Sequence, residues 1–151
     1  VGEDAWVLCQ PDSYVNVRIR PDKTSRVTGR LYSGDAVQIE GRPRNGYYHV
    51  SGVASEDGDG WVSTGYLIYS LPEEDGHRYR IDASGRVACR RGVDGTRRRW
   101  LHTDDILTVY MRSEEWCLTS QGFVRTQYID FTIPVDFQSE SNPEDMTWEA
   151  D

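Results

Sequence analysis

The same order of residues occurs twice in this chain, and this internal repeat limits what the chain can fold into. Residues 14–67 contain, in order, Val15-Asn16-Val17-Arg18, Gly34-Asp35, Tyr47-Tyr48-His49-Val50 and Gly60-Trp61-Val62-Ser63. Residues 86–129 repeat that order with Val87-Ala88-Cys89-Arg90, Asp104-Asp105, Trp116-Cys117-Leu118-Thr119 and Gly122-Phe123-Val124-Arg125. Upstream, we expect Trp6-Val7-Leu8 to correspond to Tyr79-Arg80-Ile81. A repeat of this kind indicates two copies of one small structural unit, each with its own core.

The repeated segments are predicted to form short β-strands. Val15, Val17 and Ile19 alternate with polar residues, which is the period of a half-buried strand. Turn-forming clusters such as Ser33-Gly34-Asp35 and Arg44-Asn45-Gly46 separate the strands. No window keeps a helical period, so the chain is predicted to be all-β, with two consecutive small barrels and a C-terminal extension.

The repeat also predicts the domain boundaries. We expect a first barrel at residues 5–67, a linker at 68–77, a second and diverged barrel at 78–129, and an acidic C-terminal extension at 130–151. A unit of about 50–60 residues is near the lower size limit for an independent core, so we expect the two copies to lean on each other. Within the extension, residues 131–137 are expected to form either an edge strand or an apolar strap.

Charge is unevenly distributed and argues against a general nucleic-acid binder. The chain has a net charge of −8, whereas binding to phosphate backbones needs a basic face. Arginines nevertheless concentrate between residues 86 and 99: Arg86, Arg90, Arg91, Arg97, Arg98 and Arg99. The run at 97–99 is expected to lie in a solvated loop, and the alternative is that it grips carboxylate or phosphate groups.

The sequence shows no constellation for catalysis, metal binding or cofactor binding. Cys9, Cys89 and Cys117 fit no metal-ligand spacing, and the three histidines are scattered along the chain. Cys89 and Cys117 are expected to face inward, either as free thiols or as a disulfide. The acidic segment 56–60 lacks the flanking helices and the closing Glu of an EF-hand, so we expect a plain turn. We therefore expect a non-enzymatic protein with neither metal nor cofactor.

Two features bear on location. No apolar run approaches the ~20 residues that span a bilayer, so no membrane span is expected. The first residue is Val rather than Met, and we expect that a leader or other segment was removed before this numbering begins. An export signal is the natural candidate for that segment, which would place the protein outside the cell or in the cell envelope.

The first copy resembles the bacterial SH3-like family, whose members are small β-barrel modules often attached to cell-wall enzymes. The segments that carry the resemblance are residues 15–22, 29–37, 47–50 and 60–67. The second copy departs from the family pattern, with Val93 in place of a proline, Asp104 in place of a glycine and Phe123 in place of a tryptophan. The resemblance implies two consecutive SH3-like barrels, each with five or more short antiparallel strands.

Aromatic side chains at strand ends are the main candidates for ligand binding, because their faces stack on sugar rings and on apolar peptide groups. The candidate ligand-binding residues are Tyr14, Arg18, Tyr47, Trp61, Tyr66, Arg90, Trp116 and Tyr128. Closing the barrels is the alternative role for four aromatic residues: Trp61, Tyr66, Phe123 and Tyr128. Tyr47 and Trp116 each precede an inward-facing residue on their strand, so partial exposure is expected for both.

The resemblance implies a non-enzymatic binding module that recognises peptidoglycan or its cross-linking peptides at the cell envelope. The aromatic residues would stack on this ligand, and arginines such as Arg18 and Arg90 would meet its carboxylates. Two weak sites on one chain would gain affinity through effective concentration. The alternative is a protein–protein interaction or scaffolding module without wall affinity, in which the second copy is a packing partner for the first.

Overall fold

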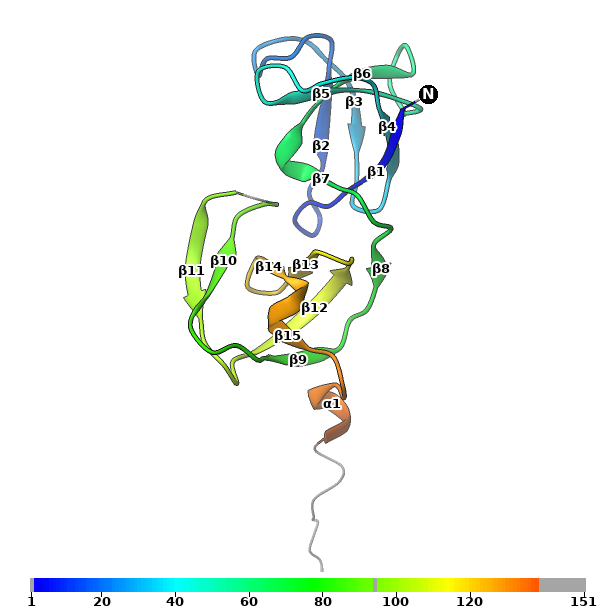
Figure 1. The fold of residues 1–151 in the computed structure, drawn as a ribbon. Helices are drawn as coiled ribbons and strands as arrows, with labels where there is room; N and C mark the ends of the chain where they lie inside the picture. The colour runs from blue at the N-terminus through cyan, green and yellow to red at the C-terminus, as the bar shows by residue number, and fades with distance from the viewer. Residues whose placement is uncertain (1, 94, 139–151) are drawn as a thin grey trace, which may run out of the picture.

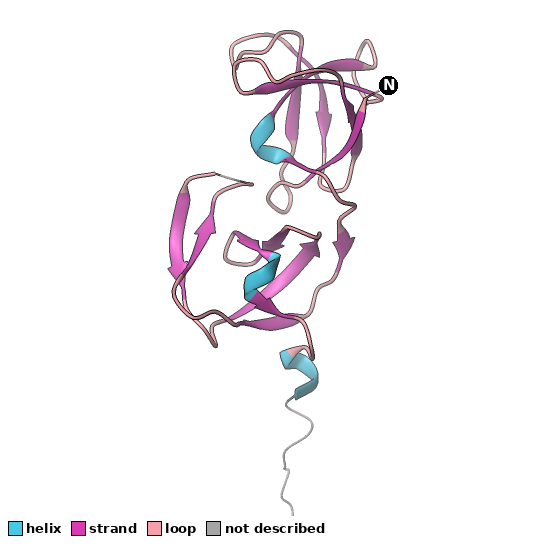
Figure 2. Ribbon diagram, in the orientation of Figure 1, coloured by secondary structure: helices cyan, strands magenta, loops and turns pink. Residues whose placement is uncertain are grey.

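Two antiparallel β-sheets, one for each copy of the repeat, make up the computed structural model, which describes residues 2–93 and 95–138 (Figure 1). The predicted all-β fold class is confirmed. Within the described residues, helical turns are confined to η1 (Thr64–Tyr66), η2 (Thr126–Tyr128) and α1 (Val135–Gln138) (Figure 2). Residues 139–151, which make up most of the expected acidic extension, lie outside the described residues.

The first copy folds into seven strands. They are β1 (Glu3–Val7), β2 (Val15–Arg18), β3 (Val27–Leu31), β4 (Ala36–Ile39), β5 (Tyr47–Ser51), β6 (Asp59–Ser63) and β7 (Leu67–Ile68). Their order in the sheet is β3-β2-β6-β5-β4-β1-β7. Apolar residues at alternate positions, such as Val17, Val50 and Val62, face inward and form the first core.

The second copy repeats this topology. Its strands are β8 (Glu73–Glu74), β9 (Arg78–Ile81), β10 (Val87–Arg90), β11 (Arg97–Leu101), β12 (Ile106–Arg112), β13 (Trp116–Thr119), β14 (Phe123–Arg125) and β15 (Ile129–Asp130). The order β11-β10-β14-β13-β12-β9-β15 matches the first sheet strand for strand, and β8 pairs with β12 outside this series. Among the described residues no ladder joins the two end strands of either sheet, so the barrels are not closed by hydrogen bonds.

Hydrogen bonding corrects one expected correspondence between the copies. The N–H of Val7 donates to the carbonyl of Asp35 at 2.9 Å, and the N–H of Ile81 makes the same bond with the equivalent aspartate at 2.8 Å. Val7 therefore corresponds to Ile81, whereas the sequence analysis aligned it with Arg80. Matching one aromatic residue with another was misleading, because Tyr79 faces the core of the second barrel.

The arginine run at 97–99 begins strand β11, and the expectation of a loop was wrong. This strand pairs with β10, and a β-bulge interrupts the register next to Arg90. The guanidinium carbons of Arg86 and Arg97 lie 3.9 and 4.6 Å from the ring centroid of Trp100. These cation–π contacts and the ladder to β10 keep the arginines in an extended conformation.

The segment that joins the copies is structured at both ends. Ile68 belongs to β7, and β8 pairs with β12 through Glu74 opposite Met111. Between them, the hydroxyl of Ser70 accepts the N–H of Glu114 at 3.0 Å. The connection is therefore attached to both barrels.

Residues after β15 do not form the expected edge strand, because the segment ends in α1. The other expectation, an apolar strap, agrees with the packing of Phe131 against the second core. Its ring lies 4.7 Å from the ring of Tyr79 in an edge-on arrangement. The packing of Phe131 and the hydrogen bond from Arg78 to Asp136 attach this segment to the barrel, while Ile133 and Phe137 are more than half exposed.

A third apolar cluster joins the two barrels, which lie end to end (Figure 1). Its buried members are Leu8, Ile68, Val93, Trp116, Leu118 and Phe123, with Trp6 and Met111 packed against them. Leu8 and Ile68 come from the first barrel, and the other buried members come from the second. The expectation that the copies lean on each other is confirmed.

Candidate ligand-binding surface

Cross-strand pairing gathers polar and aromatic side chains on the outer face of β2, β6 and β5. Trp61 lies opposite Arg18 on one neighbouring strand and opposite His49 on the other. Val62 and Val50, the next residues along β6 and β5, belong to the core, so Trp61 and His49 face outward. We call the surface formed by Arg18, Arg44, Tyr47, His49, Asp59 and Trp61 the tryptophan face.

Contacts within the tryptophan face hold the indole ring in place. The ring of His49 lies 5.1 Å from that of Trp61 and is tilted by 42°. His49 Nε2 is 3.2 Å from Asp59 Oδ2, and the guanidinium carbon of Arg44 is 5.6 Å from the indole centroid. Arg18 donates to a carbonyl of the β2–β3 loop at 2.8 Å. The indole remains only partly buried, so this face presents a fixed aromatic ring with guanidinium groups beside it.

Such a surface is suited to binding. An indole face stacks on sugar rings or on apolar peptide groups, and guanidinium groups form charge-assisted hydrogen bonds with carboxylates. Three of the predicted residues, Arg18, Tyr47 and Trp61, lie on it. Arg44, His49 and Asp59 were not among the predicted residues, because their approach to Trp61 depends on how the strands pair. The alternation that places His49 on the same side of β5 as Tyr47 was the available signal.

The other two candidates of the first barrel have different surroundings. Tyr14 packs edge-on against Tyr32 with ring centroids 6.4 Å apart, and the guanidinium carbon of Arg30 lies 4.2 Å from the Tyr14 ring. Tyr66 lines a hollow of about 260 Å³ between the barrels, opposite Val93. The predicted residues therefore do not form one continuous site.

In the second barrel the equivalent face is buried. Strand register gives three apolar equivalents: Trp116 for Tyr47, Leu118 for His49 and Phe123 for Trp61. Their side chains are 2%, 2% and 0% exposed, because they pack on the first barrel. The expected partial exposure of Trp116 is therefore wrong. Strand alternation placed this residue on the outer face, but it could not show that the other barrel covers that face.

The patch that receives this face exists only on the first barrel. It consists of Trp6, Leu8 and Ile68. At the equivalent positions, register and hydrogen bonding place the polar residues Arg80, Asp82 and Asp130 in the second barrel. At each of these two pairs of equivalent surfaces, therefore, the buried apolar residues lie only on the copy whose surface meets the other barrel.

The remaining candidates, Arg90 and Tyr128, line a small cavity of about 190 Å³ together with Arg86 and Arg125. Tyr128 also packs against the second core, which agrees with its alternative role in closing the barrel. Arg90 donates to the carbonyl of Gly95 at 2.9 Å, as Arg18 does to its own loop in the first barrel.

The cysteines are buried free thiols in the structure. Burial raises the pKa of Cys89, and it raises the pKa of Cys117 to about 11. A thiol that stays protonated is a weak nucleophile, so these side chains act as small apolar core residues. Within residues 2–93 and 95–138, no group of three or more His, Cys, Asp or Glu residues is placed to hold a metal ion.

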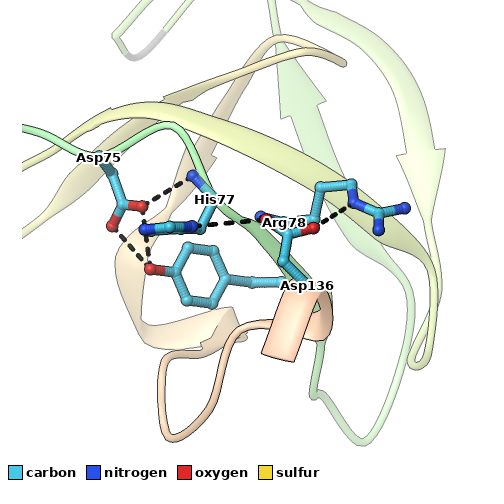
Figure 3. A network of polar contacts seen from close by, with 5 residues as sticks. Asp75, His77, Arg78 and Asp136 are labelled. Carbon is cyan, nitrogen blue, oxygen red and sulfur yellow. Dashed lines mark hydrogen bonds and ion pairs between the residues drawn. The ribbon is translucent and has the colours of Figure 1, made fainter. Parts of the chain in front are cut away.

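A polar network at the far end of the second barrel attaches α1 to β9 (Figure 3). Asp136 accepts a hydrogen bond from Arg78 Nε at 2.6 Å and lies 3.4 Å from His77 Nδ1. The hydrogen bond from Arg78 lowers the pKa of Asp136. Beside it, the hydroxyl of Tyr79 donates to Asp75, with oxygens 2.7 and 2.9 Å away. These contacts position the C-terminal segment and hold Tyr79 in the core.

Comparison with known proteins identifies the first barrel as a binding domain of a known class. Residues 13–68 match the family described as "Bacterial SH3 domain", and the match does not extend into the second sheet. The first barrel is therefore a bacterial SH3 domain, followed by a second β-sheet domain that the family pattern does not cover. Bacterial SH3 domains are typically cell-wall binding modules. A comparison with curated proteins returns no match.

Two solved structures with similarity to this chain are those of NlpC1 and NlpC2 from Trichomonas vaginalis. NlpC1 is 16% identical with a TM-score of 0.37, and the alignment covers 87% of this chain and 46% of NlpC1. NlpC2 is 15% identical with a TM-score of 0.37, and the alignment covers 87% of this chain and 49% of NlpC2. The chain thus spans less than half the length of either protein. Among the described residues, no helix has the length and apolar character needed to cross a membrane.

Proposed function

We propose that this chain is a non-enzymatic binding module that recognises peptidoglycan or its cross-linking peptides, outside the cell or in the cell envelope. The family match of residues 13–68 supports this proposal, because bacterial SH3 domains are typically cell-wall binding modules. In this proposal the two barrels, at residues 5–67 and 78–129, act as one unit.

The observation that carries the proposal is the tryptophan face of the first barrel. Trp61 offers an aromatic surface that His49 and Arg44 hold in place, and Arg18 lies on the adjacent strand. A peptide with free carboxylates fits this chemistry, because it offers apolar groups for stacking and acceptors for guanidinium donors. Burial of the equivalent face in the second barrel leaves one such face per chain, so we propose one wall site there rather than two.

The test is co-sedimentation of the full chain with isolated cell-wall sacculi. Trp61→Ala and Tyr47→Ala should each weaken binding about fivefold, which corresponds to the loss of roughly 1 kcal/mol of stacking. Tyr110→Ala is the matched control, since Tyr110 is an exposed aromatic residue on the second barrel. It should bind as the wild type does.

Two results would count against the proposal. Wild-type affinity in the folded Trp61→Ala variant would exclude the tryptophan face as the wall site. A wild-type chain that does not bind sacculi at all would favour the alternative, a protein–protein interaction module, and pull-down experiments would then follow.

A further inference from the structure

One edge of strand β11 is open in the second barrel. This strand ends the second sheet and lies at the outer side of the barrel (Figure 1). It pairs with β10 along one edge, and within residues 2–93 and 95–138 no strand or loop pairs with its other edge. The main-chain N–H and C=O groups of such an edge are available to another extended chain.

The first barrel covers the equivalent edge, that of β3, with its own β5–β6 loop. Ser55 of this loop forms an isolated β-bridge with Gly29. The N–H of Glu56 donates to the carbonyl of Thr28 at 3.1 Å, and the carboxylate of Glu56 pairs with Arg26 at 2.8 Å. An acidic segment of the chain thus occupies this edge, through main-chain hydrogen bonding and an ion pair with an arginine.

The second barrel lacks this cover because its corresponding connection is short. Residues 52–58 join β5 to β6, whereas residues 120–122 join β13 to β14. A Cβ atom at Gly29 would lie 2.3 Å from the carbonyl oxygen of Ala54, so the covered edge has no room for a side chain there. Strand register places Arg99 at the equivalent position of β11. A long side chain at this position is compatible only with an edge that no such loop crosses.

The open edge is also strongly basic. Arg97, Arg98 and Arg99 follow one another on β11, and all three are exposed. Arg97 contacts the ring of Trp100, and Arg99 donates to the side-chain oxygen of Gln121 at 2.5 Å. Among the described residues, none of the three arginines forms an ion pair with a carboxylate. Pairing with β11 of a second copy would bring like charges together, so this edge favours an acidic partner over self-association.

We propose that an acidic segment of a partner protein docks on β11 in an extended conformation and adds one strand to the second sheet. Hydrogen bonds between the two main chains supply affinity, and carboxylates on the added strand face the arginines and supply specificity. The β5–β6 loop of the first barrel shows the same chemistry within this chain. The site lies on a different barrel from the tryptophan face and does not depend on wall binding.

The test is an NMR titration of the isotope-labelled full chain with a short capped peptide that alternates valine with glutamate, at constant ionic strength. Saturable shifts of the backbone amide signals of β11 are expected. The same peptide with N-methyl groups on its backbone keeps the charge but loses amide donors, and it should bind about tenfold more weakly. A peptide with lysine in place of glutamate should also bind about tenfold more weakly, because its charges would face the arginines.

A charge reversal on β11 tests the arginines themselves. Arg98→Glu should raise the Kd of the valine–glutamate peptide about fivefold, because a cross-strand repulsion replaces an attraction. The side chain of Arg98 is exposed and forms no hydrogen bond or ion pair within the described part of the chain, so the fold should tolerate the change. Arg42→Glu, the same change at an exposed arginine of the first barrel, is the matched control and should alter the Kd less than about twofold.

Several results would overturn the proposal. They are the absence of saturable shifts in β11, shifts at another edge strand instead, equal affinity for the N-methylated or the lysine peptide, and an unchanged Kd for Arg98→Glu.

Discussion

At the scale of single residues, one polar pair explains how a tyrosine comes to lie inside the second barrel. Tyr79 is 4% exposed, and its hydroxyl donates to Asp75. Burial, and then the bond to Asp75, raises the pKa of this phenol to about 12. The sequence suggested a strand here, but a tyrosine gives no sign of whether its hydroxyl will find a buried partner, and the expected correspondence of Tyr79 with Trp6 was wrong.

The raised pKa predicts how stability depends on pH. An unfolded tyrosine loses its proton near pH 10, whereas folded Tyr79 keeps it until about pH 12. This contribution to the free energy of unfolding is therefore complete below pH 10 and is lost as the pH rises from 10 toward 12. Between pH 10 and 11 the loss should be on the order of 1 kcal/mol. Urea unfolding should show a smaller loss over this interval for Tyr79→Phe than for the wild type or for the exposed control Tyr110→Phe. Equal losses in all three chains would refute this assignment.

At the scale of the strands, the repeated pattern predicted most of what the structure shows. Alternation identified inward residues of β2 and β5, and repetition placed the inward Cys89 and Cys117 at their counterparts in β10 and β13. The loop expected for the arginines of β11 and the edge strand expected at residues 131–137 were wrong, because contacts with Trp100 and the hydrogen bond from Arg78 to Asp136 decide those segments. Local patterns give the period of a strand, whereas such contacts depend on tertiary packing.

Gly122 lies just before β14 and close to β10, where a larger side chain should destabilise the protein. Gly122 has a φ of +140°, and a Cβ atom there would lie 2.7 Å from Cys89 Sγ and 2.8 Å from the Arg90 carbonyl oxygen. Gly122→Ala should therefore destabilise the chain by about 1–3 kcal/mol through overpacking and backbone strain. Gly85→Ala is the control, because nothing lies within 4 Å of a Cβ atom at that position. Urea denaturation measures both, and a neutral Gly122→Ala would show that the strands separate at no cost.

At the scale of the whole molecule, the two barrels are coupled through one apolar contact, to which each barrel contributes a different surface. From the sequence, mutual support between small barrels was expected, yet Trp116 was expected to contact a ligand although it lies in the contact between the barrels. Leu118 and Phe123, at positions that His49 and Trp61 occupy in the first copy, were the signal of a buried face. The surfaces that the two barrels bring together depend on the connection at residues 68–77 and on the shapes of the barrels. The alternation of residues along a strand carries no information on either.

Replacing one apolar residue of this contact with its polar equivalent should separate the barrels. Ile68 is 3% exposed, and the second barrel has Asp130 at that position. Ile68→Asp would bury a carboxylate against Trp116 and Phe123 and should cost about 3–5 kcal/mol. Urea unfolding followed by tryptophan fluorescence should then resolve two transitions in place of a coupled one. Leu71→Asp, at a residue that is 61% exposed, should behave as the wild type, and a single unshifted transition for Ile68→Asp would show that the barrels fold independently of this contact.

The contact between the barrels uses a different surface on each of them, and this has a consequence for any rearrangement of the gene. A permuted chain with the second barrel placed ahead of the first would bring the tryptophan face toward Arg80, Asp82 and Asp130, a polar patch in place of the apolar one. The apolar patch around Leu8 and the apolar face around Phe123 would both be left in water at opposite ends of the molecule. Such a chain could bury them only by joining other chains head to tail, which leads to open-ended polymers. The two copies share a topology, but their order along the chain is not interchangeable.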